Sequence, residues 1–526
     1  MRFSKALQSS PHSHPSPDGE LIATLLPSSI VIRAIISLEV LRTIKLPPDI
    51  TTGVTSFLWS PSSTRVLVAL IDQIHVFSAR DGDFHGIVRI PPSTARSSFI
   101  DFGAIDREVC IWSPFGIKLT LVNFTSSKIV EIANPKFYST ASATKGCSFR
   151  AKTNHLALLT RSSGKDMISI HSPGTRELQR SWYPDTIDAQ GLAWTPDGRW
   201  LVVWESFAQS PRVLFYTSDG HIFKDWNGPL LHAPQDMGLQ FCTGVKTFTL
   251  SPHGQLAAIS NGSTCICILN TPSMVEAMRL RHPSVIHPRD TLQIWQEQNT
   301  LPNTGSFSLP AFVKAAQAVT PQWTALNSLQ EPMSGCNFAK FDCSSSLLAT
   351  RLEDSPGTIW IWDLPSSDLR AVLMYHASVT KLEWHPVHPE LLLMRCEGDS
   401  YGSLVFAWDP LSHGPRSIDM AGQFPESLSG KTYATWIRTK TESAALFFTD
   451  STTCMVVSLV DSDGETLPWH TDSEPDSPTS HESDIDMQSS PRLAYPQSED
   501  AEDSINIDLD DDYTGELDDT FQFISR

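Results

Sequence analysis

A repeated pattern with a spacing of about 44 residues constrains this 526-residue chain more than any other feature. Each copy joins an apolar or aromatic residue, a turn rich in Ser, Pro, Asp or Gly, an aliphatic run, a second polar turn and an alternating strand. Residues 57–82, FLWSPSSTRVLVALIDQIHVFSARDG, show the whole pattern, and residues 192–220, 248–270 and 382–410 repeat it. The residue just before the first turn marks each copy. These markers are Pro15, Trp59, Phe102, Phe149, Trp194, Leu250, Phe341, Trp384 and Trp436.

The spacing of the markers predicts the fold class. Successive markers lie 44, 43, 47, 45, 56, 91, 43 and 52 residues apart. A period in the low to mid forties, with four short strands in each unit, is typical of a β-propeller built from WD-type blades. A single small sheet cannot bury both faces, whereas radially packed blades cover one another. We therefore expect an all-β fold over residues 14–460, a WD-repeat β-propeller of about nine four-stranded blade units. The pattern leaves open a single large ring or a seven-bladed ring plus extra blades.

Two Trp residues in one strand raise the question of packing or docking. Trp360 and Trp362 alternate with Ile359 and Ile361, and Asp363 follows directly. Residues two apart in a strand face the same side of the sheet. We expect both Trp side chains to pack between blades and Asp363 to cap the next turn. An exposed docking surface is the alternative.

The gap of 91 residues contains an insertion. Residues at about 282–333 are irregular in pattern and rich in proline and polar side chains. A long insertion in a propeller projects from one face, so it is a candidate partner-binding loop. The alternative is a tolerated spacer.

Both ends of the chain differ in composition from the repeats. Residues 1–13 are expected to form a flexible leader. Residues 461–526 hold 20 Asp and Glu against 2 Lys and Arg, while the preceding 460 residues hold 38 acids and 37 bases. Such an acidic segment with few apolar residues is expected to be a disordered tail, and a chain cut at Asp461 is expected to keep its thermal midpoint. Ser477 and Ser490 precede prolines and are weak candidates for phosphorylation.

No residue pattern points to a catalytic, cofactor-binding or metal site. The chain lacks a Gly-x-Ser-x-Gly motif, a phosphate-binding loop and a His-Glu-x-x-His motif. Cys265 and Cys267 are spaced as C-x-C on an apolar strand, so we expect buried thiols. We nominate no catalytic, cofactor-binding or metal residues and expect no cofactor and no enzymatic activity. A neutral body with an acidic tail predicts no nucleic-acid partner, and the apolar run 28–41, broken by charges, predicts no membrane span.

Residues 348–363, LATRLEDSPGTIWIWD, carry a more specific resemblance. The Leu-Ala-Thr-Arg run, acidic spacer, Pro and alternating Trp resemble the WD repeat-containing protein eight family of centrosomes and spindle pole bodies. The next blade, LRAVLMYHASVTKLEWHPVHPELLL, is similar as well, and the insertion sits where that family has one. The resemblance covers roughly residues 14–460. The first, third and fourth repeats depart from the family pattern, and the family says nothing about the acidic tail.

The resemblance implies a non-enzymatic scaffold in the cytoplasm and cytoskeleton, at the spindle pole body or centrosome. Such an adaptor bridges a coiled-coil microtubule-anchoring protein and a minus-end-directed kinesin of the kinesin-14 class, anchors microtubule minus ends and supports spindle organisation. Microtubule surfaces are acidic, so we expect the acidic chain to contact microtubules indirectly. The alternative is a propeller scaffold of a translation-initiation or ribosome-associated complex, which a basic face would favour.

Overall fold

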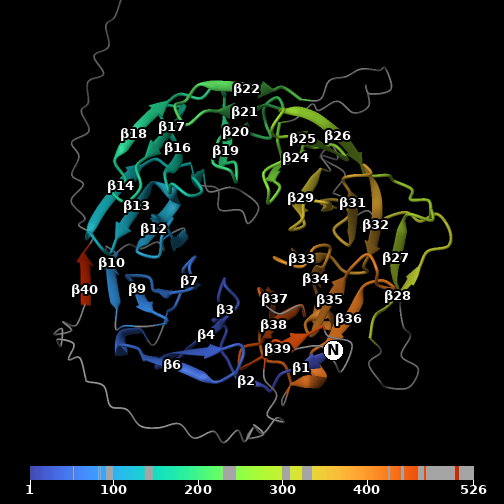
Figure 1. Ribbon diagram of the computed structural model, residues 1–526, viewed down its shortest axis with the longest axis horizontal. Helices are drawn as coiled ribbons and strands as arrows, with labels where there is room; N and C mark the ends of the chain where they lie inside the picture. Colours follow the sequence, from blue (N-terminus) through green and yellow to red (C-terminus); the bar gives the residue numbers. More distant parts are fainter. Residues whose placement is uncertain are drawn as a thin grey trace, which may run out of the picture.

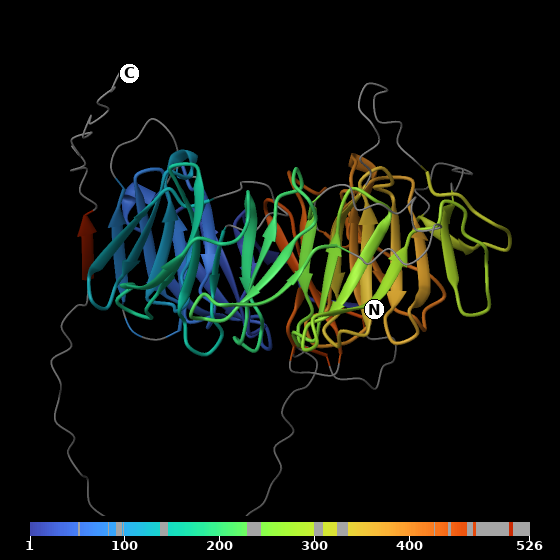
Figure 2. The same cartoon turned by 90° about the horizontal axis from the view of Figure 1, so that it is seen from above.

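Nine β-sheets surround a central opening and form a single ring in the computed structural model (Figure 1). The structure describes residues 1–50, 53–80, 82, 84–90, 97, 99–136, 146–228, 244–298, 309–322, 335–424, 427–439, 443–459, 467–469 and 504–508. The predicted nine-unit β-propeller is confirmed, and all nine blades close one ring. The strands of every blade run along the thickness of the ring (Figure 2). No helix in the described ranges is long and apolar enough to cross a membrane.

In every blade the first three strands form an antiparallel sheet that runs outward in sequence order, and in blades 1 to 8 a fourth strand continues it. The innermost strands of blades 1 to 9 are β3 (Ser13–Pro15), β7 (Ser56–Trp59), β11 (Phe99–Phe102), β15 (Cys147–Phe149), β19 (Ala189–Trp194), β23 (Thr247–Leu250), β29 (Cys336–Phe341), β33 (Val379–Trp384) and β37 (Tyr433–Ile437). The second strands are β4 (Leu21–Leu26), β8 (Arg65–Ala69), β12 (Glu108–Trp112), β16 (Leu156–Ser162), β20 (Leu201–Glu205), β24 (Leu256–Ser260), β30 (Leu347–Leu352), β34 (Leu392–Cys396) and β38 (Ala445–Thr449).

The outer half of each blade follows the same order. The third strands are β5 (Ser29–Ala34), β9 (Gln73–Ser78), β13 (Lys118–Asn123), β17 (Lys165–His171), β21 (Val213–Tyr216), β25 (Cys265–Asn270), β31 (Thr358–Asp363), β35 (Leu404–Trp408) and β39 (Thr453–Ser458). The outer strands of blades 1 to 8 are β6 (Val40–Lys45), β10 (His85–Arg89), β14 (Lys128–Ala133), β18 (Leu178–Trp182), β22 (Ile222–Trp226), β26 (Val275–Arg281), β32 (Asp368–Met374) and β36 (Arg416–Asp419). Short 3-10 helices occur as η1 (Pro48–Ile50), η2 (Pro114–Gly116), η4 (Asp399–Tyr401) and η5 (Ala421–Gln423).

The repeat markers occupy one structural position. In eight blades the marker is the last residue of the innermost strand, and in blade 9 Trp436 precedes the last residue, Ile437. The Ser, Pro, Asp and Gly residues that follow form the tight turns to the second strand, as their conformational preferences require. The sequence period therefore measures the distance from one innermost strand to the next.

The hydrophobic core is divided among the interfaces between blades. The described residues form nine clusters of buried apolar side chains, and each cluster combines residues of two neighbouring blades. Trp360 and Trp362 pack in the cluster shared with blade 6, while Ile359 and Ile361 pack in the cluster shared with blade 8. Asp363 accepts a hydrogen bond from the backbone N–H of Ser366 at 3.2 Å. The predicted packing of both Trp side chains and the turn cap are confirmed.

Blades 3 and 4 share a small apolar cluster and are joined by a buried ion pair. Arg176 donates through Nε and Nη2 to the two carboxylate oxygens of Glu108, at 2.6 and 2.7 Å. Both side chains are buried, and the guanidinium also lies 5.2 Å from the ring centre of Phe149. A bidentate pair of this kind satisfies the desolvated charges of both groups, so losing either partner would leave a buried charge unpaired.

The amino-terminal residues close the ring, which corrects the expectation of a flexible leader at residues 1–13. Blade 9 takes its outer strand from β1 (Arg2–Phe3) and β2 (Leu7–Gln8), and both pair antiparallel with β39. The backbone N–H of Ser4 donates to the carbonyl of Val456 at 2.9 Å. These strands are two residues long and interrupted by polar residues, so no alternating pattern marks them in the sequence.

The insertion at about 282–333 is only partly irregular. It contributes β27 (Gln293–Gln298) and β28 (Ala311–Lys314), which extend blade 7 to six strands. β27 pairs in parallel with β32, the outer strand of that blade. Residues 299–308 and 323–334 lie outside the described ranges.

The tail also departs from the expectation of a segment without contacts to the body. Trp469 is 6% exposed and packs in the cluster between blades 9 and 1, with Leu38 and Phe447 among its neighbours. Residues 504–508 form β40, which pairs with blade 2. Ser477 and Ser490, like all residues of 461–526 except 467–469 and 504–508, lie outside the described ranges.

One His side chain connects blades 6 and 7 through polar contacts. His282 Nδ1 donates to the carbonyl of Thr264 at 2.7 Å, because a carbonyl can only accept. Its Nε2 then accepts from the hydroxyl of Thr350 at 2.8 Å, and Thr350 Oγ1 accepts from Trp362 Nε1 at 2.9 Å. Burial lowers the pKa of His282 to about 4, opposed by the bond to Thr264. The folded state therefore holds this imidazole neutral.

We predict that folding stability falls as the pH falls from about 6.5 to about 4. The unfolded chain protonates His282 near pH 6.5 while the folded chain does not, so up to about 3 kcal/mol of stability is lost across this window. Urea unfolding at pH 7 and pH 5 measures the change. Replacing His282→Asn should lower stability at pH 7 and flatten the pH dependence relative to the parent chain. An unchanged pH dependence in that variant would contradict the assignment.

We predict that removing Trp469 destabilises the ring. A chain ending at residue 470 should unfold at nearly the temperature of the full chain, whereas a chain ending at residue 460 should lose about 3 kcal/mol, because truncating a buried Trp leaves a cavity. Trp469→Ala in the chain ending at 470 should reproduce most of that loss in differential scanning calorimetry. Equal midpoints for the two truncated chains would restore the expectation of a non-contributing tail.

A candidate docking pocket at the ring closure

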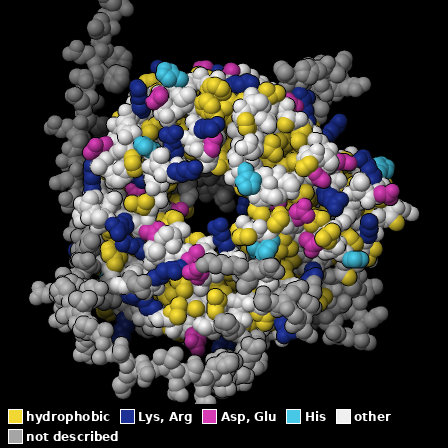
Figure 3. Space-filling model, viewed as in Figure 1, with side chains coloured by type: hydrophobic (Ala, Val, Ile, Leu, Met, Phe, Trp, Pro, Cys, Tyr) yellow, Lys and Arg dark blue, Asp and Glu magenta, His cyan; other side chains and the backbone are white. Residues whose placement is uncertain are grey.

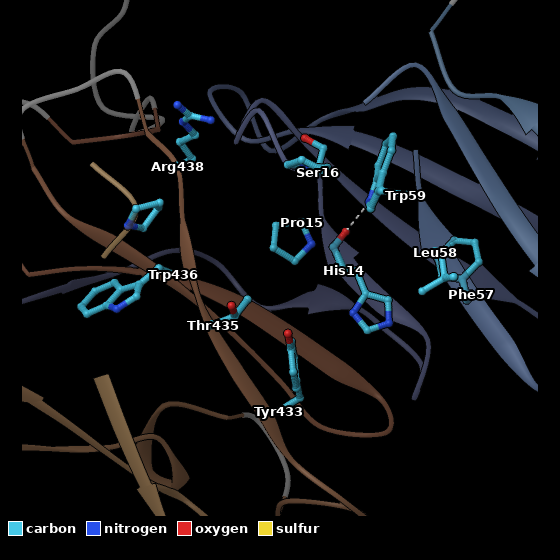
Figure 4. Close-up of a pocket in the computed structure, with 12 residues that line it drawn as sticks. His14, Pro15, Ser16, Phe57, Leu58, Trp59, Tyr433, Thr435, Trp436 and Arg438 are labelled. Carbon is cyan, nitrogen blue, oxygen red and sulfur yellow. Dashed lines mark hydrogen bonds between the residues drawn. The ribbon is translucent and has the colours of Figure 1, made fainter. Parts of the chain in front are cut away.

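A cavity of about 470 Å³ lies at the inner rim, where blades 1 and 9 meet. Its walls come from innermost strands β3, β7 and β37 and from the turns next to them (Figure 4). The lining residues are His14, Pro15, Ser16, Pro17, Phe57, Leu58, Trp59, Pro386, Tyr433, Thr435, Trp436 and Arg438. Residues from both ends of the propeller sequence therefore form one site. We refer to this cavity as the closure pocket.

Marker Trp residues connect neighbouring innermost strands around the closure pocket. Trp59 Nε1 donates to the carbonyl of His14 at 2.9 Å, and Trp436 Nε1 donates to the carbonyl of Glu383 at 2.9 Å. Trp384 makes the same contact with Lys340 outside the pocket. In each case the acceptor is the residue just before the marker of the preceding blade. These bonds fix the relative height of adjacent innermost strands and so hold the pocket walls in place.

Aromatic rings form one wall of the closure pocket. The ring centre of His14 lies 6.2 Å from that of Phe57 and 5.6 Å from that of Tyr433, the latter in an edge-on arrangement. Burial lowers the pKa of His14 to about 4, with further lowering by the positive charges of His12 and Lys381. The imidazole is therefore neutral at pH 7 and contributes an aromatic rather than a cationic surface.

A polar network supports the β37 side of the pocket. Lys381 Nζ lies 4.5 Å from the ring centre of Tyr433 and donates to the carbonyl of Ala434 at 2.5 Å. Glu383 pairs with Lys381 at 2.7 Å and accepts from the hydroxyl of Thr435 at 2.8 Å. A cation over an aromatic face stabilises that ring position. The network therefore orients Tyr433, whose side chain remains 37% exposed.

The lining suits recognition of a short peptide segment. Aromatic and Pro side chains dominate the walls, and the exposed Arg438 lies at the edge. Exposed aromatic rings over a firm base bind apolar or Pro-rich segments, because large rigid rings bury much area and lose little conformational freedom. Arg438 can pair with a carboxylate on such a segment. The lining of the closure pocket is therefore suited to binding a peptide segment of a partner protein.

The pocket residues were not nominated from the sequence as a site. Pro15, Trp59 and Trp436 were identified there only as repeat markers, and their convergence depends on ring closure. The innermost strands carry His14, Asp101 and Glu383 as their His and acidic residues, and these belong to blades 1, 3 and 8.

The thiols singled out from the sequence are buried where the apolar strand predicted. Cys265 and Cys267 lie on β25, 2% and 0% exposed. Burial raises the pKa of both thiols. They are therefore protonated packing residues, as expected.

We predict that Trp59→Phe lowers the free energy of unfolding by about 1 kcal/mol or more, because a smaller aromatic ring replaces the indole and the bond from Nε1 to the His14 carbonyl is lost. Urea unfolding at pH 7 measures the loss. Phe57→Leu, which removes no hydrogen bond, serves as a control for altered packing of the same wall. An unchanged stability of Trp59→Phe would show that this bond does not hold blades 1 and 2 together.

The amino-acid sequence is similar to WD repeat-containing proteins. It is 24% identical over 438 residues to the mouse WD repeat-containing protein WRAP73, covering 78% of this chain and 87% of that protein. It is 24% identical over 392 residues to an uncharacterized WD repeat-containing protein of Schizosaccharomyces pombe, covering 72% of this chain and 74% of that protein. No family model matches the chain.

Two solved structures have a weaker likeness. The Dos1 propeller has a TM-score of 0.47 and 10% identity, covering 78% of this chain and 93% of that chain. A eukaryotic initiation factor has a TM-score of 0.48 and 10% identity, covering 79% of this chain and 90% of that chain. At these TM-scores neither likeness carries an argument about function. Over most of its length the chain is therefore similar to WD repeat-containing proteins, and it folds as a nine-bladed ring.

Proposed function

We propose that this protein is a non-enzymatic WD-repeat scaffold that works at a spindle pole body or centrosome. In this role it bridges a coiled-coil microtubule-anchoring protein and a kinesin-14-type motor, anchors microtubule minus ends and supports spindle organisation. The closure pocket is the observation that carries the proposal. Tyr433 and Trp59 are partly exposed in this pocket, and hydrogen bonds between neighbouring innermost strands hold its walls in place.

The ring itself is suited to a scaffold. Nine buried interfaces between blades make the body a stiff support, since close-packed cores deform little. A partner segment that binds in the closure pocket therefore meets a surface whose geometry is already set. Preorganisation of this kind reduces the entropy lost on binding.

The cellular assignment rests on the family resemblance of residues 348–363 and of the blades on either side. Charge supports indirect attachment to microtubules, since the chain carries a formal net charge of −19 and microtubule surfaces are acidic. The coiled-coil partner and the motor would then supply filament contact, while the propeller would hold them together.

The alternative scaffold, in a translation-initiation or ribosome-associated complex, would call for a basic face. Figure 3 shows Lys and Arg side chains interspersed with Asp and Glu on the described part of the face in view. A mixed surface of this kind gives no reason to prefer a nucleic-acid-rich partner.

We predict that Tyr433→Ala weakens binding to the coiled-coil partner by about tenfold or more, because an exposed aromatic anchor in a pocket contributes strongly to affinity. The partner is first isolated by affinity purification with the tagged full chain, and its affinity for each variant is measured by titration calorimetry. Tyr183→Ala, at a Tyr that is 68% exposed at the end of blade 4, is the matched control and should bind as the parent does.

Co-pelleting with microtubules at moderate salt separates the parts of the proposal. The parent chain should stay in the supernatant alone and pellet when the coiled-coil partner is added, whereas Tyr433→Ala should stay in the supernatant in both cases. Strong pelleting of the parent chain alone would refute indirect anchoring. Recovery of ribosomal proteins or initiation factors as the stoichiometric partners would refute the cellular assignment.

A further inference from the structure

A tail segment lies along the outer edge of blade 2. β40 (Ser504–Asp508) pairs in parallel with β10, from His85 opposite Ser504 to Arg89 opposite Asp508. Figure 1 shows β40 on the outside of the ring beside β10, and Figure 2 shows the same strand, in red, at the outer edge of the ring. A segment more than 400 residues away in the sequence thus adds a fifth strand to this blade.

The outer edges of the blades differ in charge. In the described part of the chain, β6, β14, β18, β22 and β26 pair with no strand beyond them. Each carries charge in its interior, in the form of Arg42, Glu131, Arg180, Lys224, Asp225, Glu276 and Arg279. Charged side chains on an edge strand oppose the docking of another strand. These five edges are therefore protected.

Two outer strands accept a further parallel strand, and both have an uncharged run where that strand pairs, although β32 carries Arg370 just before its paired part and β10 ends in Arg89. The middle of β10 is Gly86-Ile87-Val88, and the paired part of β32 is Ala371–Met374. Blade 8 lies between these two classes of edge. Its outer strand β36 has charges only at its ends, and a side chain of this strand contacts the insertion, since Ser417 Oγ donates to the carbonyl of Pro310 at 2.6 Å. An uncharged run on the outer strand therefore coincides with strand addition.

The two added strands are held differently. β27 inserts the buried Ile294 and Trp295 into the cores of blade 7 and its neighbours and forms a hairpin with β28. β40 is a single strand of five residues, connected through residues 470–503 to Trp469. β27 is thus part of blade 7. β40, in contrast, is joined to blade 2 by its pairing with β10.

Charge matches the tail segment to this edge. In the sequence, Glu502 and Asp503 precede β40, and Asp508 ends it next to further acids. Three residues before β10, the carbonyl of Gly82 accepts a hydrogen bond from Arg42, and at the end of β10 Arg89 is opposite Asp508 in the register. In the sequence, Ile505 and Ile507 thus lie between acids, and their strand pairs with an uncharged run that ends in Arg89.

We propose that the outer edge of β10 is a docking site for an extended segment with Ile at alternate positions and acidic flanks, and that residues 504–508 of the same chain fill it as a displaceable strand. Backbone pairing supplies the affinity and the charged ends supply the selectivity, as in other cases of strand addition. The tether gives the chain's own segment a high effective concentration, so the site is masked until the tail is released. This site is separate from the closure pocket.

A chain ending at residue 470 tests the proposal, because it keeps Trp469 and lacks β40. The probe is a fluorescein-labelled peptide of residues 499–512, measured by fluorescence anisotropy at low salt. We expect micromolar binding to the truncated chain and binding at least about tenfold weaker to the full chain, whose own strand competes. Hydrogen exchange at residues 85–89 should be about tenfold faster in the truncated chain and should slow again when the peptide is added.

Matched variants separate strand pairing from charge attraction. A peptide with both Ile505→Pro and Ile507→Pro keeps every charge and should not bind, because proline removes backbone donors. Ile87→Glu in the truncated chain should abolish binding, while Ile129→Glu on β14 should not, with thermal unfolding confirming that both variants fold. Tyr433→Ala should bind the peptide as the parent does.

Several results would overturn the proposal. Equal peptide binding by the full and truncated chains would place the site elsewhere, and equal binding of the proline peptide would reduce the interaction to charge. Unchanged hydrogen exchange at residues 85–89 would show that β40 does not cover the edge in solution. Tail-dependent dimers in analytical ultracentrifugation would show that the strand docks on a second copy instead of its own chain.

Discussion

The whole structure depends on face-to-face packing between neighbouring blades. A four-stranded sheet has two apolar faces, and here each face is buried only by the next blade, so that every core is shared. Trp360 and Ile361 show this within one strand, because adjacent residues enter the cores on opposite sides of blade 7. A blade at an open end would expose one complete face, so closure into a ring is what makes the array stable.

Closure in turn determines where the chain ends must lie. The last blade lacks an outer strand of its own, and β1 and β2 supply it from the other end of the sequence. Trp469, which follows the last repeat in the sequence, packs in the core shared by blades 9 and 1. The closure pocket forms at the same seam, because only there do β3 and β37 lie side by side. The candidate docking surface is thus a product of ring closure.

The inner and outer rims present two kinds of interaction surface. The inner rim offers aromatic and Pro side chains fixed by hydrogen bonds between blades, which suits side-chain recognition. The outer rim offers backbone edges, most of which carry charges that discourage strand addition. Blade 2 is the case in which an uncharged edge meets a tail strand. A scaffold with both surfaces can hold partners by two independent mechanisms.

The sequence by itself determined the repeating unit. The marker period, the turn residues and the alternation around Trp360 and Trp362 predicted about nine four-stranded blades and the packing of these side chains, because such patterns act over a few residues. Tertiary structure alone decided that nine blades form one ring, that residues 2–8 complete blade 9, that β27 and β28 extend blade 7, and that Trp469 is buried. It also decided that Pro15, Trp59 and Trp436 surround one cavity. Local patterns specify strands and turns, whereas pairings between segments hundreds of residues apart depend on the curvature accumulated over all the blades.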